Sequence, residues 1–139
     1  MKSNSLRIVR RCDVVVVGGA VRAVAAAVAA AEAGRRVILV APRTCLGDDM
    51  CATLRMGVDW DSDSMGQLAK RIFSEGNPAR PLHVKKVLDA ALLEAGVECL
   101  YASYATEPLW DADDELAGVA IANRAGRQAV AARVVIDAT

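Results

Sequence analysis

The sequence has 139 residues, which is the size of one domain or of part of one. Hydrophobic residues make up 54% and aromatic residues only 4%, so we expect a core of Ala, Val and Leu, as in helices packed tightly on a sheet. The 17 basic and 17 acidic residues cancel, which argues against a nucleic-acid-binding domain, since such domains are normally basic.

Three further features favour a cytoplasmic protein. The basic N-terminal segment lacks the apolar stretch of a signal peptide. The valine run near the N-terminus is too short to cross a membrane. The four cysteines, which show no CxxC spacing, are expected to be reduced, buried thiols rather than disulfides or zinc ligands (Cys12, Cys45, Cys51 and Cys99).

The first elements form a βαβ unit of about 30 residues. Four consecutive valines, residues 14–17, lead into two glycines, which predicts a strand over 13–18 that is buried on both faces, as in a parallel sheet. Alanine dominates residues 20–33, which predicts a helix that stops at Gly34. A second buried strand is predicted over 36–41, before Pro42. The N-terminus of the helix, directly after the glycines, is a place where a phosphate can bind.

The middle of the chain is less regular. Residues 43–62 are predicted to be loop, and residues 64–76 a helix. Residues 83–96 have the apolar spacing of an amphipathic helix, and a third strand is predicted over 97–101.

The C-terminal part predicts a change from helices to short strands. Turn signals at Asp113-Asp114 and Ala125-Gly126 divide residues 107–131 into two consecutive hairpins, a small antiparallel meander that we expect to pack across one end of the sheet. The segment "VVID" within 133–137 predicts a return to the parallel sheet. The expected fold is therefore α/β, with a parallel sheet, flanking helices and a meander.

The glycine turn departs from the usual dinucleotide-binding fingerprint. Gly18 supplies the first glycine, which permits the tight turn. Ala20 stands where the second glycine lets the backbone approach a pyrophosphate, and Ala23 where the third allows close packing of helix on strand. The acid that binds ribose hydroxyls is expected near position 41, and the sequence there is Ala41-Pro42-Arg43. Arg43 could instead pair with the phosphate of NADP.

Four segments in this order resemble the N-terminal part of FAD-dependent oxidoreductases of the glutathione-reductase-like superfamily, which has a Rossmann-like fold. They are "DVVVVGGAVRAVAAAVAAAEAGRRVILV", the loop "TCLGDDMCATL", the segment "HVKKVLDAALLEAGVECLYAS", and the meander that ends in "ARVVIDAT". The last is the most specific, because simple NAD-binding Rossmann domains lack the meander.

The resemblance implies FAD as the cofactor and roles for particular residues. The turn from Gly18 to Ala23 would wrap the pyrophosphate, and residues 41–43 would lie beside the adenosine ribose. Ala105 would meet the adenine with its backbone. The residues implied to bind the cofactor are Gly18, Gly19, Ala20, Val21, Arg22, Ala23, Ala41, Pro42, Arg43, Leu46, Gly47, Ala105, Ala138 and Thr139.

Asp48 and Asp49 weaken the match, because they place carboxylates near the expected diphosphate, where like charges repel. No residue in the chain is identified as a catalyst, and His83 is expected to be a solvated or capping residue. Two other hypotheses stay open. The chain could be a non-catalytic assembly subunit that has lost FAD, or an NADP-binding domain that uses Arg43.

The resemblance also implies that more than half of the family's length lies beyond this segment. The substrate domain and catalytic residues would come from a second chain or be missing, so we expect the isolated chain to be inactive. The strand containing "VVID" needs neighbours and covering layers on both faces. We therefore expect a partner chain that completes the FAD domain, or else self-association.

Overall fold

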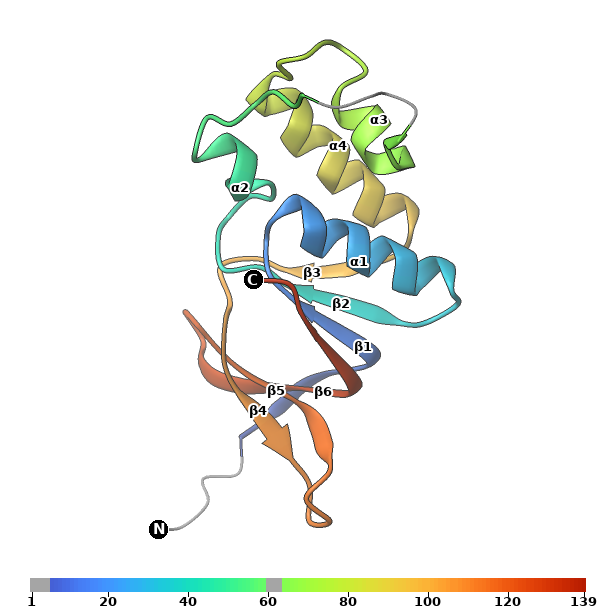
Figure 1. Ribbon diagram of the computed structural model, residues 1–139. Helices are drawn as coiled ribbons and strands as arrows, with labels where there is room; N and C mark the ends of the chain where they lie inside the picture. Colours follow the sequence, from blue (N-terminus) through green and yellow to red (C-terminus); the bar gives the residue numbers. More distant parts are fainter. Residues whose placement is uncertain (1–5, 60–63) are drawn as a thin grey trace.

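The computed structural model describes residues 6–59 and 64–139. Within these residues the elements in chain order are β1 (Ile8–Val17), α1 (Val21–Glu32), β2 (Val37–Val40), α2 (Asp48–Cys51), α3 (Gln67–Ile72), α4 (Pro81–Glu94), β3 (Glu98–Leu100), β4 (Tyr104–Trp110), β5 (Leu116–Asn123) and β6 (Gly126–Asp137). The strands form one sheet in the order β3-β2-β1-β6-β5-β4 (Figure 1).

The sheet has a parallel and an antiparallel part, which share β6. In the parallel part, Val15 of β1 lies opposite Ile38 of β2 and Val135 of β6. In the antiparallel part, β5 pairs with residues 126–131 of β6 on one side and with β4 on the other. β6 is therefore both the last meander strand and a neighbour of β1.

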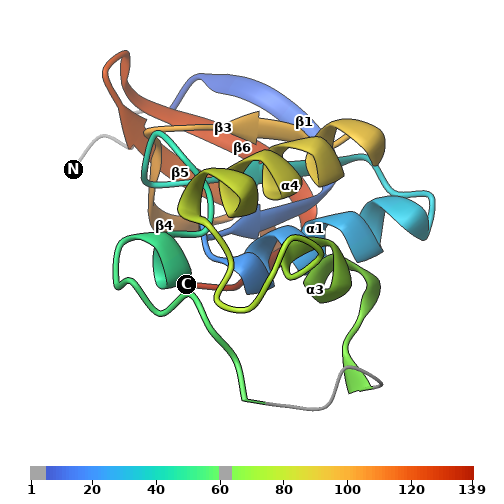
Figure 2. The ribbon, with the colours of Figure 1, turned by 90° about the horizontal axis from the view of Figure 1, so that it is seen from above.

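Two apolar layers cover the parallel strands, as the continuous valine run predicts. Val14 and Val16 of β1 point to the helices and pack with Val24 of α1 and Leu88 of α4. Val15 points to the other face, where residues of β5 and β6 fold back over the parallel strands. Figures 1 and 2 show the helices gathered on one side of the parallel strands and the meander part of the sheet on the other.

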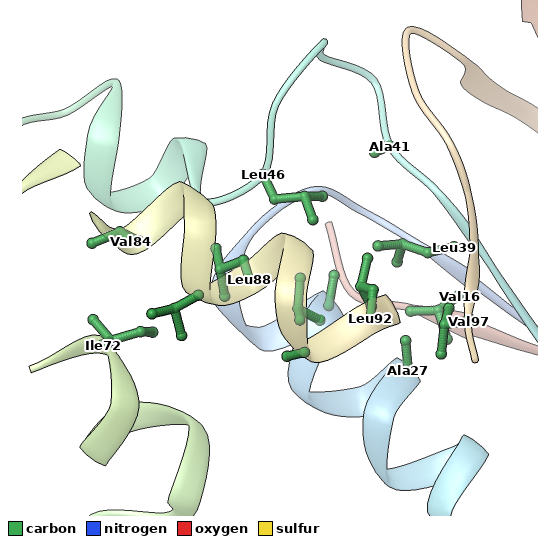
Figure 3. Packing of buried hydrophobic residues seen from close by; sticks show 14 of the residues in the cluster. Val16, Ala27, Leu39, Ala41, Leu46, Ile72, Val84, Leu88, Leu92 and Val97 are labelled. Atoms are coloured by element: carbon green, nitrogen blue, oxygen red, sulfur yellow. The ribbon is translucent and has the colours of Figure 1, made fainter. Parts of the chain in front are cut away.

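The helical side of the core is built from alanines on α1 and larger side chains on α4. Ala23 and Ala27 are fully buried, so α1 lies close to the sheet. Val84, Leu88 and Leu92 repeat along one face of α4 and point into the same layer, as Figure 3 shows. The predicted α/β fold with a Rossmann-like parallel sheet and a meander is confirmed.

Several predicted boundaries were wrong. β1 begins at Ile8 rather than near 13, because its first residues pair with the meander half of β6. For the same reason the meander continues the sheet, and it covers one face of the parallel strands instead of lying across one end. The helix predicted over 64–76 is limited to α3, which has Gly66 as its N-cap. The helix predicted to begin at 83 starts at Pro81, a favoured first helical residue.

The segment predicted as loop over 43–62 contains α2, and its residues 60–62 lie outside the described residues. Gly47, in the left-handed conformation (φ 77°), precedes this helix. Two acids in its first turn, Asp48 and Asp49, favour a helix start. The two acids are therefore a feature of the sequence from which the start of α2 could have been predicted.

The described residues contain no helix long and apolar enough to span a bilayer.

Candidate cofactor site

The glycine turn and the end of β6 are joined by a close backbone approach. Gly18 has φ 139°, and a Cβ atom placed on it would lie 2.5 Å from the carbonyl oxygen of Ala138. The Ala138 N–H donates to Val17 O at 2.9 Å, and the Gly18 N–H donates to Val40 O at 2.9 Å. Gly18 and Ala138, which are 120 positions apart in the sequence, are therefore in contact at the start of α1.

A cavity of about 360 Å³ opens at this meeting point. It lies against the N-terminus of α1, the end of β2 and the start of α2. The ribbon views show the C-terminal end of the chain close to these segments (Figures 1 and 2). Its lining residues are Gly18, Gly19, Ala20, Arg22, Pro42, Arg43, Asp48, Asp49, Ala52, Thr53, Ala138 and Thr139.

Eight of the fourteen residues implied by the resemblance line this cavity, and the other six do not. Ala23, Ala41, Leu46 and Gly47 are buried beneath it, and Val21 takes part through its backbone. Ala105 lies on β4 opposite Ile121 and packs on the meander side of the sheet. The sequence analysis missed Ala52 and Thr53, because it did not predict α2.

A second cavity, of about 660 Å³, adjoins the first. The two share Pro42 and Arg43, directly after β2. The second is also lined by the segment around β4 and by the β5–β6 hairpin, through Thr44, Ala102, Tyr104, Ala122, Asn123 and Arg124. The curl of the sheet brings the hairpin to the end of β2, which no local sequence pattern predicts.

Both acids of α2 make polar contacts at the cavity. The Val21 N–H, in the first turn of α1, donates to Asp49 Oδ1 at 3.1 Å. Arg43 Nε donates to Asp48 Oδ2 at 3.1 Å. The sequence analysis placed these carboxylates near the expected diphosphate but did not predict that one of them would bind the start of α1.

The end of the chain folds back on itself at the cavity rim. Asp137 Oδ1 accepts hydrogen bonds from the Thr139 N–H at 3.1 Å and from its hydroxyl at 2.8 Å. These bonds hold the pKa of Asp137 below its usual value. Thr139 is thereby oriented at the mouth of the cavity.

Neither His83 nor the cysteines contribute side chains to the two cavities. His83 Nε2 lies 3.0 Å from Arg71 O of α3, and Nδ1 lies 3.3 Å from Glu75 Oε1, so His83 links two helices. All four cysteines are free thiols. Cys12 is buried as expected, whereas the other three are only half-buried.

Cys99 should be the least reactive thiol at neutral pH. Burial raises its pKa to about 11, against a smaller lowering by the neighbouring Tyr101 side chain. Since the thiolate is the reactive form, alkylation by iodoacetamide should rise about tenfold per pH unit without a plateau up to pH 10. Site-resolved mass spectrometry measures this rate. A rate that is half-maximal near pH 8.5 and levels off between about pH 9 and 10, as for a cysteine in a free peptide, would contradict the burial of Cys99.

The backbone of the site fits a dinucleotide. Gly18 gives the tight turn, α1 points its N-terminus at the first cavity, and the two adjoining cavities suit an elongated ligand. The carboxylate of Asp49 on the Val21 N–H is the feature that does not suit a pyrophosphate. In outline, then, the residues present accommodate a dinucleotide.

The parallel sheet, the glycine turn before α1 and the meander together define a dinucleotide-binding α/β protein of the FAD-binding type. The family described as FAD dependent oxidoreductase matches residues 13–139, so the chain belongs to this family. The cofactor of the family is FAD. No protein of curated function matches the sequence.

Several solved structures are similar to the chain. THI4 from Thermovibrio ammonificans is 20% identical with a TM-score of 0.70, over 93% of this chain and 57% of that one. A geranylgeranyl bacteriochlorophyll reductase-like protein from Thermoplasma acidophilum is 21% identical with a TM-score of 0.69, over 93% of this chain and 39% of that one. L-proline dehydrogenase from P. horikoshii is 17% identical with a TM-score of 0.62, over 94% of this chain and 53% of that one. The chain thus spans less than two thirds of these proteins.

Proposed function

We propose that the chain is the FAD-binding portion of an FAD-dependent oxidoreductase whose catalytic residues and substrate domain lie outside the present sequence. When bound, FAD supplies the redox chemistry of such an enzyme. The observation that carries the proposal is the cavity where the Gly18 turn, the start of α1 and the Ala138–Thr139 segment meet. The chain's own task is to bind and orient the cofactor.

The two adjoining cavities suggest how FAD would lie. Its pyrophosphate would face the first turn of α1 in the smaller cavity, where backbone N–H groups and Arg22 favour negative charge. Its adenosine would pass Pro42 and Arg43 into the larger cavity, beside Tyr104. No acid stands at the end of β2 to bind the ribose hydroxyls, and the pairing of Arg43 with Asp48 offers little support for NADP.

Reconstitution with FAD tests this function. The purified chain, dialysed to equilibrium against FAD, should bind flavin, which is measured by its absorption band near 450 nm. A Gly19→Glu variant gives the comparison, because Gly19 lines the cavity and a Cβ atom there makes only ordinary contacts, so the added carboxylate opposes the pyrophosphate without the backbone overlap expected at Gly18. Equal flavin in both proteins, or none in either, would contradict the proposal.

Replacing Ala20 with glycine should strengthen FAD binding. Ala20 is the N-cap of α1 and lines the smaller cavity, so its methyl group stands where the fingerprint has its second glycine. Glycine is also a better N-cap than alanine, so the helix should not be weakened. We expect severalfold more bound flavin per chain in the same dialysis. An unchanged ratio would show that the methyl group is not an obstacle.

We also propose a partner that completes the sheet, or failing that, self-association. Residues 126–131 of β6 pair with β5, whereas for residues 132–137 the only strand neighbour among the described residues is β1. Val134 lies in this second segment and is 48% exposed. An open strand edge with an exposed apolar side chain is a place where another strand can add.

Size-exclusion chromatography with light scattering tests the association. The chain alone should elute as a dimer or a larger species. Co-expressed with a partner chain that completes the FAD domain, it should elute in a complex with that partner. Val134→Lys should shift it toward the monomer, because a charge on an edge strand opposes pairing. A wild-type monomer with a cooperative melt would contradict the proposal.

A non-catalytic assembly subunit that has lost FAD is the second candidate. The Asp49 contact with the Val21 N–H favours it, since this carboxylate already lies where a phosphate would bind. The two candidates differ in the reconstitution experiment, because only the first predicts flavin retention.

A further inference from the structure

We propose that Asp49 is an internal competitor for FAD, whose carboxylate takes the position of the pyrophosphate at the start of α1 and so sets a low affinity for the cofactor. The inference deepens the proposed function and depends on it for the identity of the ligand. It concerns a residue of the chain itself, and it follows from the geometry of α1 and α2.

The start of α1 offers an anion site that its own N-cap leaves open. The first backbone N–H groups of a helix have no partner inside the helix, and a Ser, Thr, Asp or Asn N-cap usually binds one of them. Ala20 has no side chain that can do so. The Val21 N–H instead finds its acceptor 28 residues along the chain, in Asp49 Oδ1 at 3.1 Å. A carboxylate at this end of a 12-residue helix is also favoured by the helix dipole.

Asp49 is held in this position by the packing of its own loop. The Gly47 N–H donates to Gly19 O at 2.7 Å, which ties the start of α2 to the glycine turn. Leu46 is 1% exposed and anchors the loop in the core. The Thr53 hydroxyl donates to Asp49 O at 2.6 Å. The backbone of Asp49 is therefore held beside the cavity, and from there its carboxylate reaches the Val21 N–H.

The charges around the cavity are already balanced within the chain. Arg22 and Arg43 bring two positive charges, while Asp48 and Asp49 bring two negative ones, and Arg43 is paired with Asp48. A pyrophosphate that enters must displace Asp49 from the Val21 N–H and then lie beside its charge. Like charges about 4 Å apart at a protein surface repel enough to weaken binding roughly tenfold or more.

The test measures FAD and inorganic pyrophosphate binding to the full chain and to three variants. Asp49→Asn removes the charge and keeps a hydrogen-bond acceptor for the Val21 N–H. Asp49→Ala removes both. Asp113→Asn makes the same chemical change in the exposed β4–β5 turn and is the matched control. FAD binding is followed by flavin fluorescence, pyrophosphate binding by calorimetry, and stability without ligand by thermal melting.

Both Asp49 variants should bind each probe about tenfold more tightly or better, and Asp113→Asn should match the wild type. Asp49→Ala should also melt at a lower temperature without ligand, because the Val21 N–H loses its acceptor. Tighter binding combined with lower stability distinguishes a competitor from a merely structural residue, whose loss would lower both.

Wild-type or weaker binding of both probes by Asp49→Asn would overturn the inference and leave the proposed function standing. If no variant binds FAD but Asp49→Asn gains pyrophosphate binding, the competition is supported and the FAD function fails. If neither probe binds to any of the folded proteins, the inference is overturned. Asp49→Asn answers the question by itself if Asp49→Ala does not fold.

Discussion

Replacing Gly18 with alanine is expected to lower the free energy of unfolding by about 3 to 5 kcal/mol. At φ 139° an alanine is strained, and its Cβ would lie 2.5 Å from the carbonyl oxygen and 2.9 Å from the carbonyl carbon of Ala138. Those atoms are backbone and cannot rotate away. The Ala138 N–H donates a hydrogen bond to Val17 O, so a shift of Ala138 that relieves the overlap would pull the end of β6 away from β1. Thermal melting should show a fall of roughly 10 °C.

Gly19→Ala is the matched control, since it adds the same methyl group one residue along the turn. A Cβ on Gly19 would lie 3.5 Å from Pro42 Cδ, 3.7 Å from Ala41 Cβ and 3.9 Å from Asp48 Oδ1, which are ordinary contacts. We expect its melting temperature to stay within a few degrees of wild type. Equal losses at the two glycines would show that the approach of Ala138 is not what requires Gly18.

Leu88→Ala is expected to cost about 3 kcal/mol. Leu88 is fully buried on α4, in the layer shown in Figure 3. Leu88 also packs against the loop that leads to α2, because its Cδ1 would be the atom nearest to a Cβ atom placed on Gly47. The cavity left by the substitution should therefore loosen the wall of the cofactor site as well as the core. Urea denaturation gives the loss of stability.

Leu93→Ala provides the comparison on the same helix. Leu93 is 80% exposed, and alanine is a slightly better helix former than leucine. Its free energy of unfolding should change by less than about 0.5 kcal/mol. Similar losses at Leu88 and Leu93 would contradict the packing of α4 described above.

The elements with strong local patterns could be predicted from the sequence. The run from Val14 to Val17 is apolar on both faces, and the structure covers it on both faces. The alanines of α1, the apolar spacing of α4 and the glycines that follow them, Gly34 and Gly96, predicted the ends of both helices to within two residues. Here the local pattern and the tertiary structure agree.

The rest depends on contacts between distant segments. The meander signals were correct, but nothing local shows that β6 continues without a break from the β5 hairpin into the parallel sheet beside β1. In the same way, the composition around Gly18 predicts a tight turn but not its contact with Ala138. That contact depends on the register between β1 and β6.

The candidate site was predicted in composition but not in its internal contacts. Gly18, Arg43 and Thr139 do meet at one cavity. Asp49 was expected to repel a phosphate, whereas in the structure it binds the N–H that a phosphate would use. Predicting that contact requires the short helix α2 and the position of its loop on the glycine turn, and both depend on the burial of Leu46.

The central claim is that the chain binds FAD at the start of α1, and amide NMR shifts during an FAD titration test it most directly. The account predicts that the amides of Gly19, Val21 and Thr139 shift and saturate together, while those of the β4–β5 turn at 111–115 do not move. Saturable shifts confined to other regions, or no shifts at millimolar FAD, would contradict it.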